Sequence, residues 1–464
     1  MNEKIKAWFE GREDEFVNAL APLVAIDSTT GTPAPGAPFG EGPAKALKAA
    51  LELAESWGLK TSEDDGYVGL VDLNDHEDQL HVLAHLDVVG IGDGWNTDPF
   101  TLVRDGDMIY GRGTDDDKGP ALAAMMAMRC VKELGLPLTK NVKLVLGTDE
   151  ETGSRDIEHY YAHAPFAPNS VTPDAEFPVI NVEKARYAPE FSAAWEKVDV
   201  LPRLVSVKGG IRANVAPGHC TAVVAGVESD TVQAACAGVA ERTGVEFLLS
   251  GDAQELTIQA NGAEAHASTP DEGKNAITAL LEVLCQLPLG DTPAFDAVKK
   301  LHKVFPFGDN SGKALGVAQQ DEISGPLTLS FSVLNLDETG FKGQFDVRAS
   351  VCANEENLVK VTEQTFADFG WTCEGELDAA HVVDPNSEFI HTLLDCYTEF
   401  SGEKGYCVAI GGGTYVHDIP GGVAFGAGEF GFDSHLHGAN ERARISRLLM
   451  TAQIYASVIA RLCA

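Results

Sequence analysis

The chain has 464 residues, which is enough for two to three domains with a sizeable core. Hydrophobic residues make up 44% and charged residues 22% of it, the balance of a soluble globular protein. Seventy acidic against 34 basic residues give a formal net charge of −36, and such a polyanion repels nucleic acids and anionic membrane surfaces. We therefore expect neither a nucleic-acid partner nor a membrane partner.

Nine cysteines are scattered along the sequence without the spacing of a metal clip. This usage is typical of buried thiols in a reducing compartment. The first ten residues contain no apolar signal core, and no stretch approaches transmembrane length. The sequence therefore predicts a cytoplasmic location.

Two amphipathic helices open the chain. Apolar residues recur at helical spacing over Asp14–Ile26 and over Pro43–Gly58. The segment Ser28–Gly42 between them is rich in Gly, Pro, Ser and Thr, which predicts a loop.

A buried strand is predicted next, over Gln79–Val89, and it carries His81, His85 and Asp87. His81 and His85 are four residues apart, about 13 Å along a strand, which is too far to share one ion. His85 and Asp87 face the same side of the strand, where a carboxylate can fix the tautomer of a metal-bound imidazole. A strand histidine without a metal is the alternative interpretation.

Three adjacent carboxylates, Asp115, Asp116 and Asp117, lie in the Gly-rich turn Gly111–Gly119, before a helix predicted over Pro120–Leu136. Neighbouring carboxylates repel each other by roughly 1 kcal/mol or more at protein-surface dielectric. A cation of high charge relieves that repulsion most simply. The alternative is a solvated acidic turn with an aspartate helix cap.

Further acidic residues follow predicted strands. The apolar run Val142–Leu146 is typical of a central parallel strand, and Glu150 and Glu151 come shortly after it. Asp174 precedes the next apolar run. In open α/β sheets, sites assemble at the carboxyl ends of strands. One glutamate could then bind a metal while its neighbour acts as a base, and a plain polar loop is the alternative.

From about Ala188 the pattern changes to Val- and Ala-rich strands with two predicted helices, Ser229–Thr243 and Lys274–Leu287. A composition shift near His381–Pro385 leads into a predicted helix, Ser387–Phe400. We infer one α/β domain that is split in sequence, with a mixed, mostly parallel sheet flanked by helices, and an inserted α+β domain. The predicted parts are residues 1–187 and 383–464 for the split domain and residues 188–382 for the insertion.

The C-terminal part begins with a Gly-rich loop, Gly411–Asp418, and ends with a predicted helix, Ser446–Leu462. Between them His435 and His437 are candidate metal ligands. A single loop histidine is otherwise most often a surface residue.

Taken together, five segments resemble the aminoacylase/carboxypeptidase-type dinuclear metallopeptidase family, in particular its PepV-like dipeptidase branch. The segments are HLDVV at His85–Val89, GRGTDDDKGP at Gly111–Pro120, GTDEETG at Gly147–Gly153, TPDAEFPV at Thr172–Val179 and HGANE at His437–Glu441. They occur in the family's order along the chain.

The resemblance implies a centre with two divalent metal ions per subunit. Asp116 would bridge both ions, and its peptide bond to Asp117 would be cis. The remaining ligands implied are His85 and Asp174 at one ion and Glu151 and His437 at the other. Zinc is the expected metal, with manganese or cobalt as alternatives.

The resemblance also implies roles for residues around the metals. Glu150 would be the general base, Asp87 would orient His85, and His266 of the insertion would stabilise the oxyanion. The implied ligands of the substrate carboxylate are Asn214, Arg348 and the loop around Gly413. No role is implied for His81, Asp115, Glu176, Asp433 or His435.

The function implied is a metal-dependent dipeptidase that hydrolyses unblocked dipeptides, small peptides being its only expected partners. A metal-bridging water would attack the peptide carbonyl. The alternatives are an N-acyl-amino-acid deacylase or carnosinase-like hydrolase, and a catalytically silent metal- or peptide-binding protein. The insertion resembles a doubled lid that supplies His266 within one chain, so a monomer is expected, with a dimer as the alternative.

Overall fold

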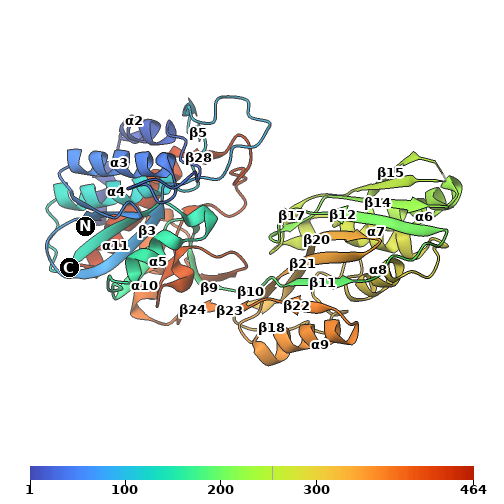
Figure 1. Cartoon of the computed structure of the whole chain (residues 1–464). Coiled ribbons are helices and arrows are strands. Elements are labelled where there is room, and N and C mark those ends of the chain that lie inside the picture. Colours follow the sequence, from blue (N-terminus) through green and yellow to red (C-terminus); the bar gives the residue numbers. More distant parts are fainter. Residues whose placement is uncertain (253) are drawn as a thin grey trace. The chain divides into compact units, whose positions relative to one another are not determined.

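The computed structural model describes residues 1–252 and 254–464, which form two compact units. The first unit consists of Met1–Val182, Val382–Val408 and Gly413–Ala464, and the second of Glu183–His381 and Ala409–Gly412 (Figure 1). The predicted boundary after residue 187 is therefore a few residues late. The reason is that β10 (Ala185–Tyr187) pairs with β21 (Gly340–Ala349) in the sheet of the second unit.

The first unit is built on a mixed nine-stranded sheet. Its strand order is β1-β2-β6-β3-β7-β26-β9-β24, with β25 beside β9. The strands are β1 Lys60–Asp64, β2 Val68–Asp72, β3 Asp78–His85, β6 Asn141–Gly147, β7 Asn169–Thr172, β9 Val179–Glu183, β24 His381–Val382, β25 Cys407–Ile410 and β26 Val423–Ala424. The central pairs β6-β3, β3-β7 and β7-β26 are parallel, whereas β1, β2 and β9 pair antiparallel. Parallel pairing is thus concentrated at the centre, where the strands are apolar and buried.

Helices pack on this sheet or on one another. They are α1 Asn2–Phe9, α2 Glu13–Val24, α3 Glu41–Ser56, α4 Lys118–Glu133, α5 Arg155–Tyr161, α10 Glu388–Ser401 and α11 Ile445–Leu462. Helix α4 contacts β3 and β6 as well as α2 and α11, and its side chains are buried along most of its length. The predicted helices are confirmed to within a few residues. The two short helices α1 and α5 were not predicted, because too few turns are present to establish a period.

The second unit contains a ten-stranded sheet with the order β15-β16-β14-β12-β20-β21-β10-β23, extended by β11 and β22. Its further strands are β11 Glu190–Ala194, β12 Arg203–Gly209, β14 His219–Ala225, β15 Glu246–Gly251, β16 Leu256–Asn261, β20 Thr328–Asp337, β22 Thr372–Glu374 and β23 Leu377–Asp378. Helices α6 Ser229–Thr243, α7 Ala276–Cys285, α8 Pro293–Val304 and α9 Lys360–Asp368 share one core with it. Of these, α8 and α9 were not predicted. The doubled lid stays a prediction.

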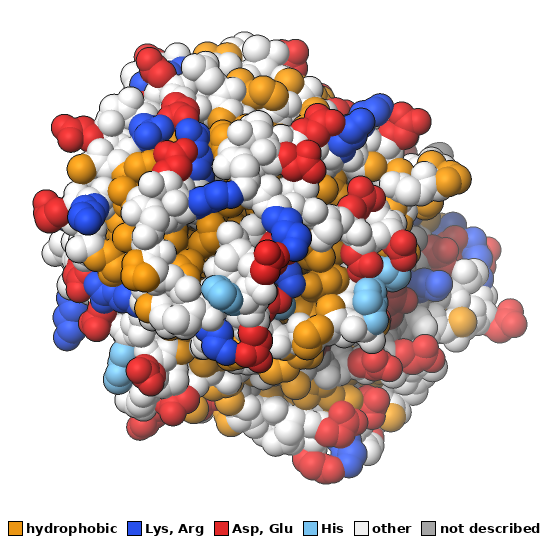
Figure 2. All heavy atoms as spheres, turned by 90° about the vertical axis from the view of Figure 1, so that its left-hand side faces the viewer, with side chains coloured by type: hydrophobic (Ala, Val, Ile, Leu, Met, Phe, Trp, Pro, Cys, Tyr) orange, Lys and Arg blue, Asp and Glu red, His pale blue; other side chains and the backbone are white. Residues whose placement is uncertain are grey.

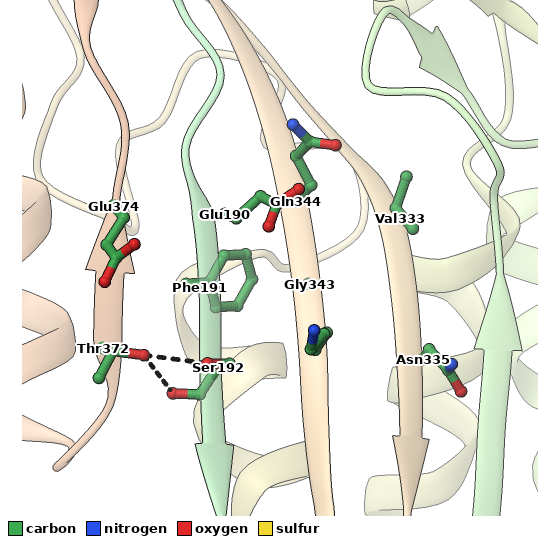
Figure 3. Close-up of a pocket in the computed structure, with 10 residues that line it drawn as sticks. Glu190, Phe191, Ser192, Val333, Asn335, Gly343, Gln344, Thr372 and Glu374 are labelled. Carbon is green, nitrogen blue, oxygen red and sulfur yellow. Dashed lines mark hydrogen bonds between the residues drawn. The ribbon is translucent and has the colours of Figure 1, made fainter.

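A hollow of about 380 Å³ lies over β11, β20, β21 and β22 of the second unit. Figure 3 shows its lining, including Phe191, Asn335 and Gln344, with Thr372 hydrogen-bonded to Ser192. None of the residues that line it is a predicted site residue. In the described part of the chain, no helix is long and apolar enough to cross a membrane.

Candidate active site

The carboxyl ends of three central strands bring four predicted site residues to one edge of the sheet of the first unit. His85 is the last residue of β3 and lies opposite Gly147, the last residue of β6. A 3-10 helix, Glu150–Thr152, begins three residues after the end of β6 and carries Glu150 and Glu151. Asp174 follows β7, the other parallel neighbour of β3, by two residues. This arrangement is the one expected for parallel strands.

A small second sheet brings the Asp turn and the C-terminal histidine loop together. Strand β5 (Met108–Tyr110) immediately precedes the turn, and β28 (Arg442–Arg444) immediately follows the loop. The two strands pair antiparallel, in a three-stranded sheet with β4 (Val103–Asp105). Asp116 and His437 therefore reach the same place from positions 321 residues apart in the sequence.

Asp116 lies at the centre of the cluster. Its Oδ1 is 2.9 Å from Nε2 of His85, and its Oδ2 is 3.0 Å from Nε2 of His437. Nε2 of His437 is also 3.3 Å from Oε2 of Glu151, and Nε2 of His85 is 3.8 Å from Oδ2 of Asp174. The two carboxylate oxygens of Asp116 thus face two separate groups of donor atoms.

Two donor atoms of the cluster are left without a hydrogen bond among the described residues. Nε2 of His85 and Oε1 of Glu151 are buried, and neither has a hydrogen-bond partner within residues 1–252 and 254–464. Nε2 of His85 is 2.9 Å from Oδ1 of Asp116, a separation that lets both atoms bind one ion. Buried polar atoms without partners are rare, and divalent cations satisfy such imidazole and carboxylate groups. The residues therefore fit metal ions on both sides of Asp116.

Electrostatics also favour cations here. Burial, reinforced by the charge of Asp174, raises the pKa of Glu150 well above its ordinary value. Burial and the charge of Asp116 raise the pKa of Asp174 to about 7. The carboxylates of Asp116 and Glu151 raise the pKa of His437 to about 10. A cluster that holds extra protons in this way exchanges them for metal ions when these bind.

Asp87 differs from its predicted geometry, because β3 ends at His85 and Asp87 lies beyond the strand. Nδ1 of His85 is 3.0 Å from the backbone oxygen of Asp87 and 3.4 Å from its carboxylate. The carboxylate accepts the backbone N–H groups of Glu150 and Glu151, at 3.2 and 3.1 Å. Asp87 therefore turns Nε2 of His85 toward the cluster and at the same time holds the segment that carries both glutamates.

Two buried residues that sequence reasoning gave no role, Glu441 and Arg112, hold the Asp turn. The Glu441 carboxylate accepts the backbone N–H groups of Gly113, Asp115 and Asp116 at 2.9–3.2 Å. Arg112 donates to it from Nη1 at 2.6 Å. The Asp116–Asp117 peptide in this turn is cis, as expected. Both residues lie in the quoted motifs, but a lone acid or base in a loop gives no sign of its partner.

A second missed pair, Tyr415 and Asp156, supports the end of β6. The Tyr415 hydroxyl donates to Oδ2 of Asp156 at 2.5 Å. The same oxygen accepts the N–H groups of Thr148 and Asp149. Asp156 lies in α5, so failure to predict that short helix also hid this contact.

The residues without an implied role have other surroundings. His81 is buried and contacts Tyr161 and Asp78, and His435 pairs with Asp433 at 3.2 Å. Asp115 and Glu176 line a hollow of about 170 Å³ together with Asp116 and Asp174. Burial raises the pKa of Asp115 to about 7 and also raises the pKa of Glu176, so the two groups make the space beside the cluster acidic and hold their protons to higher pH than exposed carboxyl groups.

The predicted substrate-binding residues lie in the second unit, apart from Gly413, an exposed residue of the first. His266 pairs with Val215 in a two-stranded sheet, and the oxygen of the adjacent Asn214 accepts the N–H of Ala267. Nδ1 of His266 is 2.6 Å from Oγ of Ser268. Arg348 donates to Asp346 at 2.6 Å and to the backbone oxygen of Gly411. A Cβ on Gly411 would lie 2.7 Å from that of Ser268. Asn214, His266 and Arg348 therefore gather at one place within this unit.

Known proteins share both sequence and fold with the chain. It matches the model of Peptidase family M20/M25/M40 over residues 81–461. It is 34% identical over 457 residues to YtjP of Bacillus subtilis (strain 168), which carries a provisional dipeptidase name, with 97% of each chain covered. It is 32% identical over 467 residues to the Beta-Ala-Xaa dipeptidase of Lactobacillus delbrueckii subsp. lactis, with 99% of this chain and 98% of that one covered. Human carnosine dipeptidase 1 has a similar fold, with a TM-score of 0.58 at 16% identity, covering 100% of this chain and 98% of that one.

Proposed function

The chain belongs to peptidase family M20/M25/M40, and from that premise we propose that it is a metal-dependent dipeptidase acting on unblocked dipeptides. One observation carries the proposal. His85, Asp116, Glu151, Asp174 and His437 come from five distant segments and form one cluster around Asp116. We also propose that the protein is a monomer in the cytoplasm. All nine cysteines, each within the described residues, are free thiols, which fits a reducing compartment.

Two divalent ions fit this cluster, and zinc suits its mixture of imidazole and carboxylate donors. His85 and Asp174 would hold one ion, Glu151 and His437 the other, and Asp116 both. Bound there, the ions would polarise the peptide carbonyl and lower the pKa of water.

Glu150 is the residue proposed to move protons. Its carboxylate lies with His85 and Asp174 in one group, with donor atoms within 4.8 Å of one another. Two features raise its pKa, burial and the neighbouring carboxylate of Asp174. A carboxylate of raised pKa can take a proton from the attacking water and then deliver it to the leaving amine. Its backbone N–H is held by Asp87, which keeps the side chain at the edge of the cluster.

Recognition of an unblocked dipeptide requires groups for both of its termini. Asp115 and Glu176 line the hollow beside Asp116, and their carboxylates would attract a free α-amine. Arg348, Asn214 and Gly413 are proposed to bind the substrate carboxylate, since a guanidinium offers two parallel hydrogen bonds to it. His266 is proposed to stabilise the oxyanion. The acidic hollow favours a dipeptidase over an N-acyl-amino-acid deacylase, because an acylated amine carries no charge.

A carnosinase-like preference for N-terminal β-alanine is the second candidate, supported by the name of the Lactobacillus relative. Both candidates can be tested with the zinc-loaded protein and three matched substrates: an α-dipeptide, its β-alanyl counterpart and its N-acetylated form. We expect hydrolysis of the unblocked dipeptides, loss of activity with a chelator, and recovery with zinc, manganese or cobalt. Faster hydrolysis of the N-acetylated form would favour the deacylase instead.

The role of Glu150 is tested by Glu150→Gln, which keeps the shape of the side chain but cannot take a proton. We expect turnover to fall at least about a hundredfold while the bound metal is retained. Metal content measured on the same sample separates this result from a lost binding site. Turnover near that of the unmodified protein would show that a group other than Glu150 is the base. Measurable turnover in the unmodified protein would itself exclude a catalytically silent binding protein.

A further inference from the structure

A second cluster of metal-ligating side chains lies in the first unit and shares no residue with the cluster around Asp116. We propose that Asp64, His159 and His163 form a site for one divalent transition metal of the zinc type. One donor atom from each of the three residues lies within 4.8 Å of the other two.

The local structure explains why these residues meet. His159 and His163 are four residues apart, about one helical turn, so their side chains project from the same face of α5 and its C-terminal continuation. Helical hydrogen bonds continue past Tyr161, since the N–H of Ala164 donates to the oxygen of Tyr160 at 3.0 Å. Asp64 is the last residue of β1, at the turn into β2, and α5 packs on β2.

The donor atoms face one another without forming hydrogen bonds. Nε2 of His163 is 3.1 Å from Oδ2 of Asp64. Even so, that oxygen and Nε2 of His159 are both buried atoms that lack a hydrogen-bond partner in the part of the chain that is described. An ordinary His–Asp pair would direct an N–H at the oxygen. Here Oδ2 of Asp64 and Nε2 of His159 lack such a partner within the described residues, and a cation bound between the three side chains would satisfy both atoms.

The spacing of the donors also fits a metal. A tetrahedral zinc with Zn–N bonds of about 2.0–2.1 Å holds its ligand atoms roughly 3.3 Å apart. The 3.1 Å contact already matches that separation, and the other two pairs lie within 4.8 Å. The ring of His163 is the exposed one, so its rotation can bring the donors to the distances of a bound ion. Two imidazoles and one carboxylate suit zinc and its transition-metal neighbours better than magnesium or calcium, which prefer oxygen donors alone.

Neighbouring groups hold the site in place. The ring of His159 stacks on Tyr67, with centroids 3.9 Å apart and an angle of 11° between the planes. The backbone oxygen of Tyr67 accepts the Thr148 hydroxyl at 2.7 Å, which fixes that residue in turn. Oδ2 of the exposed Asp65 is 3.7 Å from Nε2 of His159 and adds negative charge beside it, while the fourth position of a tetrahedral ion would be left to water.

A metal at this site would tie α5 to the β1–β2 turn. Helix α5 begins shortly after Glu150 and Glu151, and its Asp156 holds the end of β6. The bound ion would therefore act as a structural cross-link for the helix that supports the catalytic segment.

The test is the zinc content per chain of the full-length protein after metal removal and reloading with zinc. Asp64→Asn and His163→Gln should each bind one zinc fewer than the unmodified protein. The matched control is His391→Gln, which changes an exposed histidine on α10 and should bind as much zinc as the unmodified protein. Equal zinc in His163→Gln and the unmodified protein would overturn the proposal. The side chain of His163 is 55% exposed, so this variant should fold normally.

A second measurement separates this site from the proposed catalytic centre. In the double variant His85→Ala/His437→Ala, one cobalt ion should still bind and give visible absorption of a site with nitrogen ligands. Adding His163→Gln to that variant should abolish the absorption. If it persists, the proposal fails whatever happens at the catalytic centre. If His163→Gln removes one metal while His85→Ala/His437→Ala removes none, the proposed catalytic centre fails and this inference stands.

Discussion

Glu441 is a buried carboxylate that binds four groups, the Arg112 guanidinium and three backbone N–H groups. The side chains of Glu441 and Arg112 are 0% and 1% exposed, and the carboxylate also holds three backbone N–H groups of the Asp turn. Glu441→Gln would leave the guanidinium buried beside a neutral group. We expect a loss of about 3–5 kcal/mol in the free energy of unfolding, measured by denaturant titration.

The control for this variant is Glu429→Gln. Glu429 pairs with Arg444 at 2.8 Å, but both side chains are about 40% exposed. Exposed pairs contribute only about 0–1 kcal/mol, so this variant should be nearly neutral. Equal losses in the two variants would mean that burial of the Glu441 pair does not set its contribution.

Asp78 predicts a dependence of stability on pH. Burial alone would raise its pKa, but contacts with His81, Lys143 and Asn141 outweigh burial and hold the pKa well below its ordinary value. A depressed pKa in the folded state stabilises the fold above the unfolded pKa of about 3.9, and this stability is lost as the pH falls further. The difference in Tm between the unmodified protein and Asp78→Asn should therefore be large at neutral pH and shrink below about pH 4.

The control for Asp78 is Asp75→Asn, which removes an ion pair with Lys60 whose side chains are 69% and 83% exposed. Solvent screens that pair, so the corresponding difference in Tm should be small at every pH. A difference for Asp78→Asn that stays constant down to acid pH would contradict the assigned cause.

Residue roles were predictable from the sequence only where a motif marks them. Each of the five predicted metal ligands lies in a quoted motif, and the structure brings them into one cluster. Contacts made across the fold carry no such mark. Arg112 and Glu441 are 329 positions apart, and nothing in either local sequence indicates that they form a buried pair. The cluster of Asp64, His159 and His163 was not predicted either, because the short helix α5 was missed and only the fold brings Asp64 to the two histidines.

At the scale of elements, the end of β6 shows why a glycine is needed beside the catalytic segment. A Cβ on Gly147 would lie 2.0 Å from the hydroxyl oxygen of Tyr415 and 2.4 Å from Oδ2 of Asp156. Gly147→Ala must therefore displace this buried pair, at a cost of about 1–3 kcal/mol. Because Asp156 also holds the N–H groups of Thr148 and Asp149, Glu150 should shift, and turnover should fall up to about a hundredfold.

The matched substitution is Gly90→Ala, for which the structure leaves open space around the new Cβ. Its stability should stay within about 0.5 kcal/mol of the unmodified protein, with normal turnover. The measurements are the Tm and the kcat of Gly147→Ala and Gly90→Ala, each compared with the unmodified protein. A neutral Gly147→Ala variant would show that Tyr415 and Asp156 do not support the catalytic segment.

Elements were predicted best where the hydrophobic pattern is long. Helix α6 has the predicted bounds Ser229–Thr243, and α11 differs from its prediction by one residue. The predicted strand runs four residues past the C-terminal end of β3, because Leu86, Val88 and Val89 continue its apolar run. Residues that leave a strand but stay buried look the same in sequence as residues within it.

The whole molecule is two units joined by short segments around residues 182–183, 381–382 and 408–413. The sequence pattern indicated the insertion, since residues 188–382 have their own pattern of strands and helices. Its first limit was placed too late, because β10 is only three residues long and its pairing with β21 alone assigns it to the second unit. Pairing over such a sequence distance is a property of the fold rather than of a local pattern.

The net charge of −36 predicts how the whole molecule responds to salt. Acidic and basic side chains are interspersed over the face that Figure 2 shows, but acids outnumber bases two to one over the whole chain. The excess acids repel one another in the folded state, and an ionic strength of about 0.1 M screens charges more than about 10 Å apart. Screening also weakens exposed ion pairs, although each contributes only about 0–1 kcal/mol. We therefore expect the Tm of the metal-loaded protein to rise when NaCl is added to a buffer of low ionic strength.

KCl should give the same rise in Tm, because screening depends on ionic strength and not on the identity of the ion. A Tm that falls with both salts would show that ion pairs outweigh the general repulsion, and a rise with only one would indicate binding of that ion.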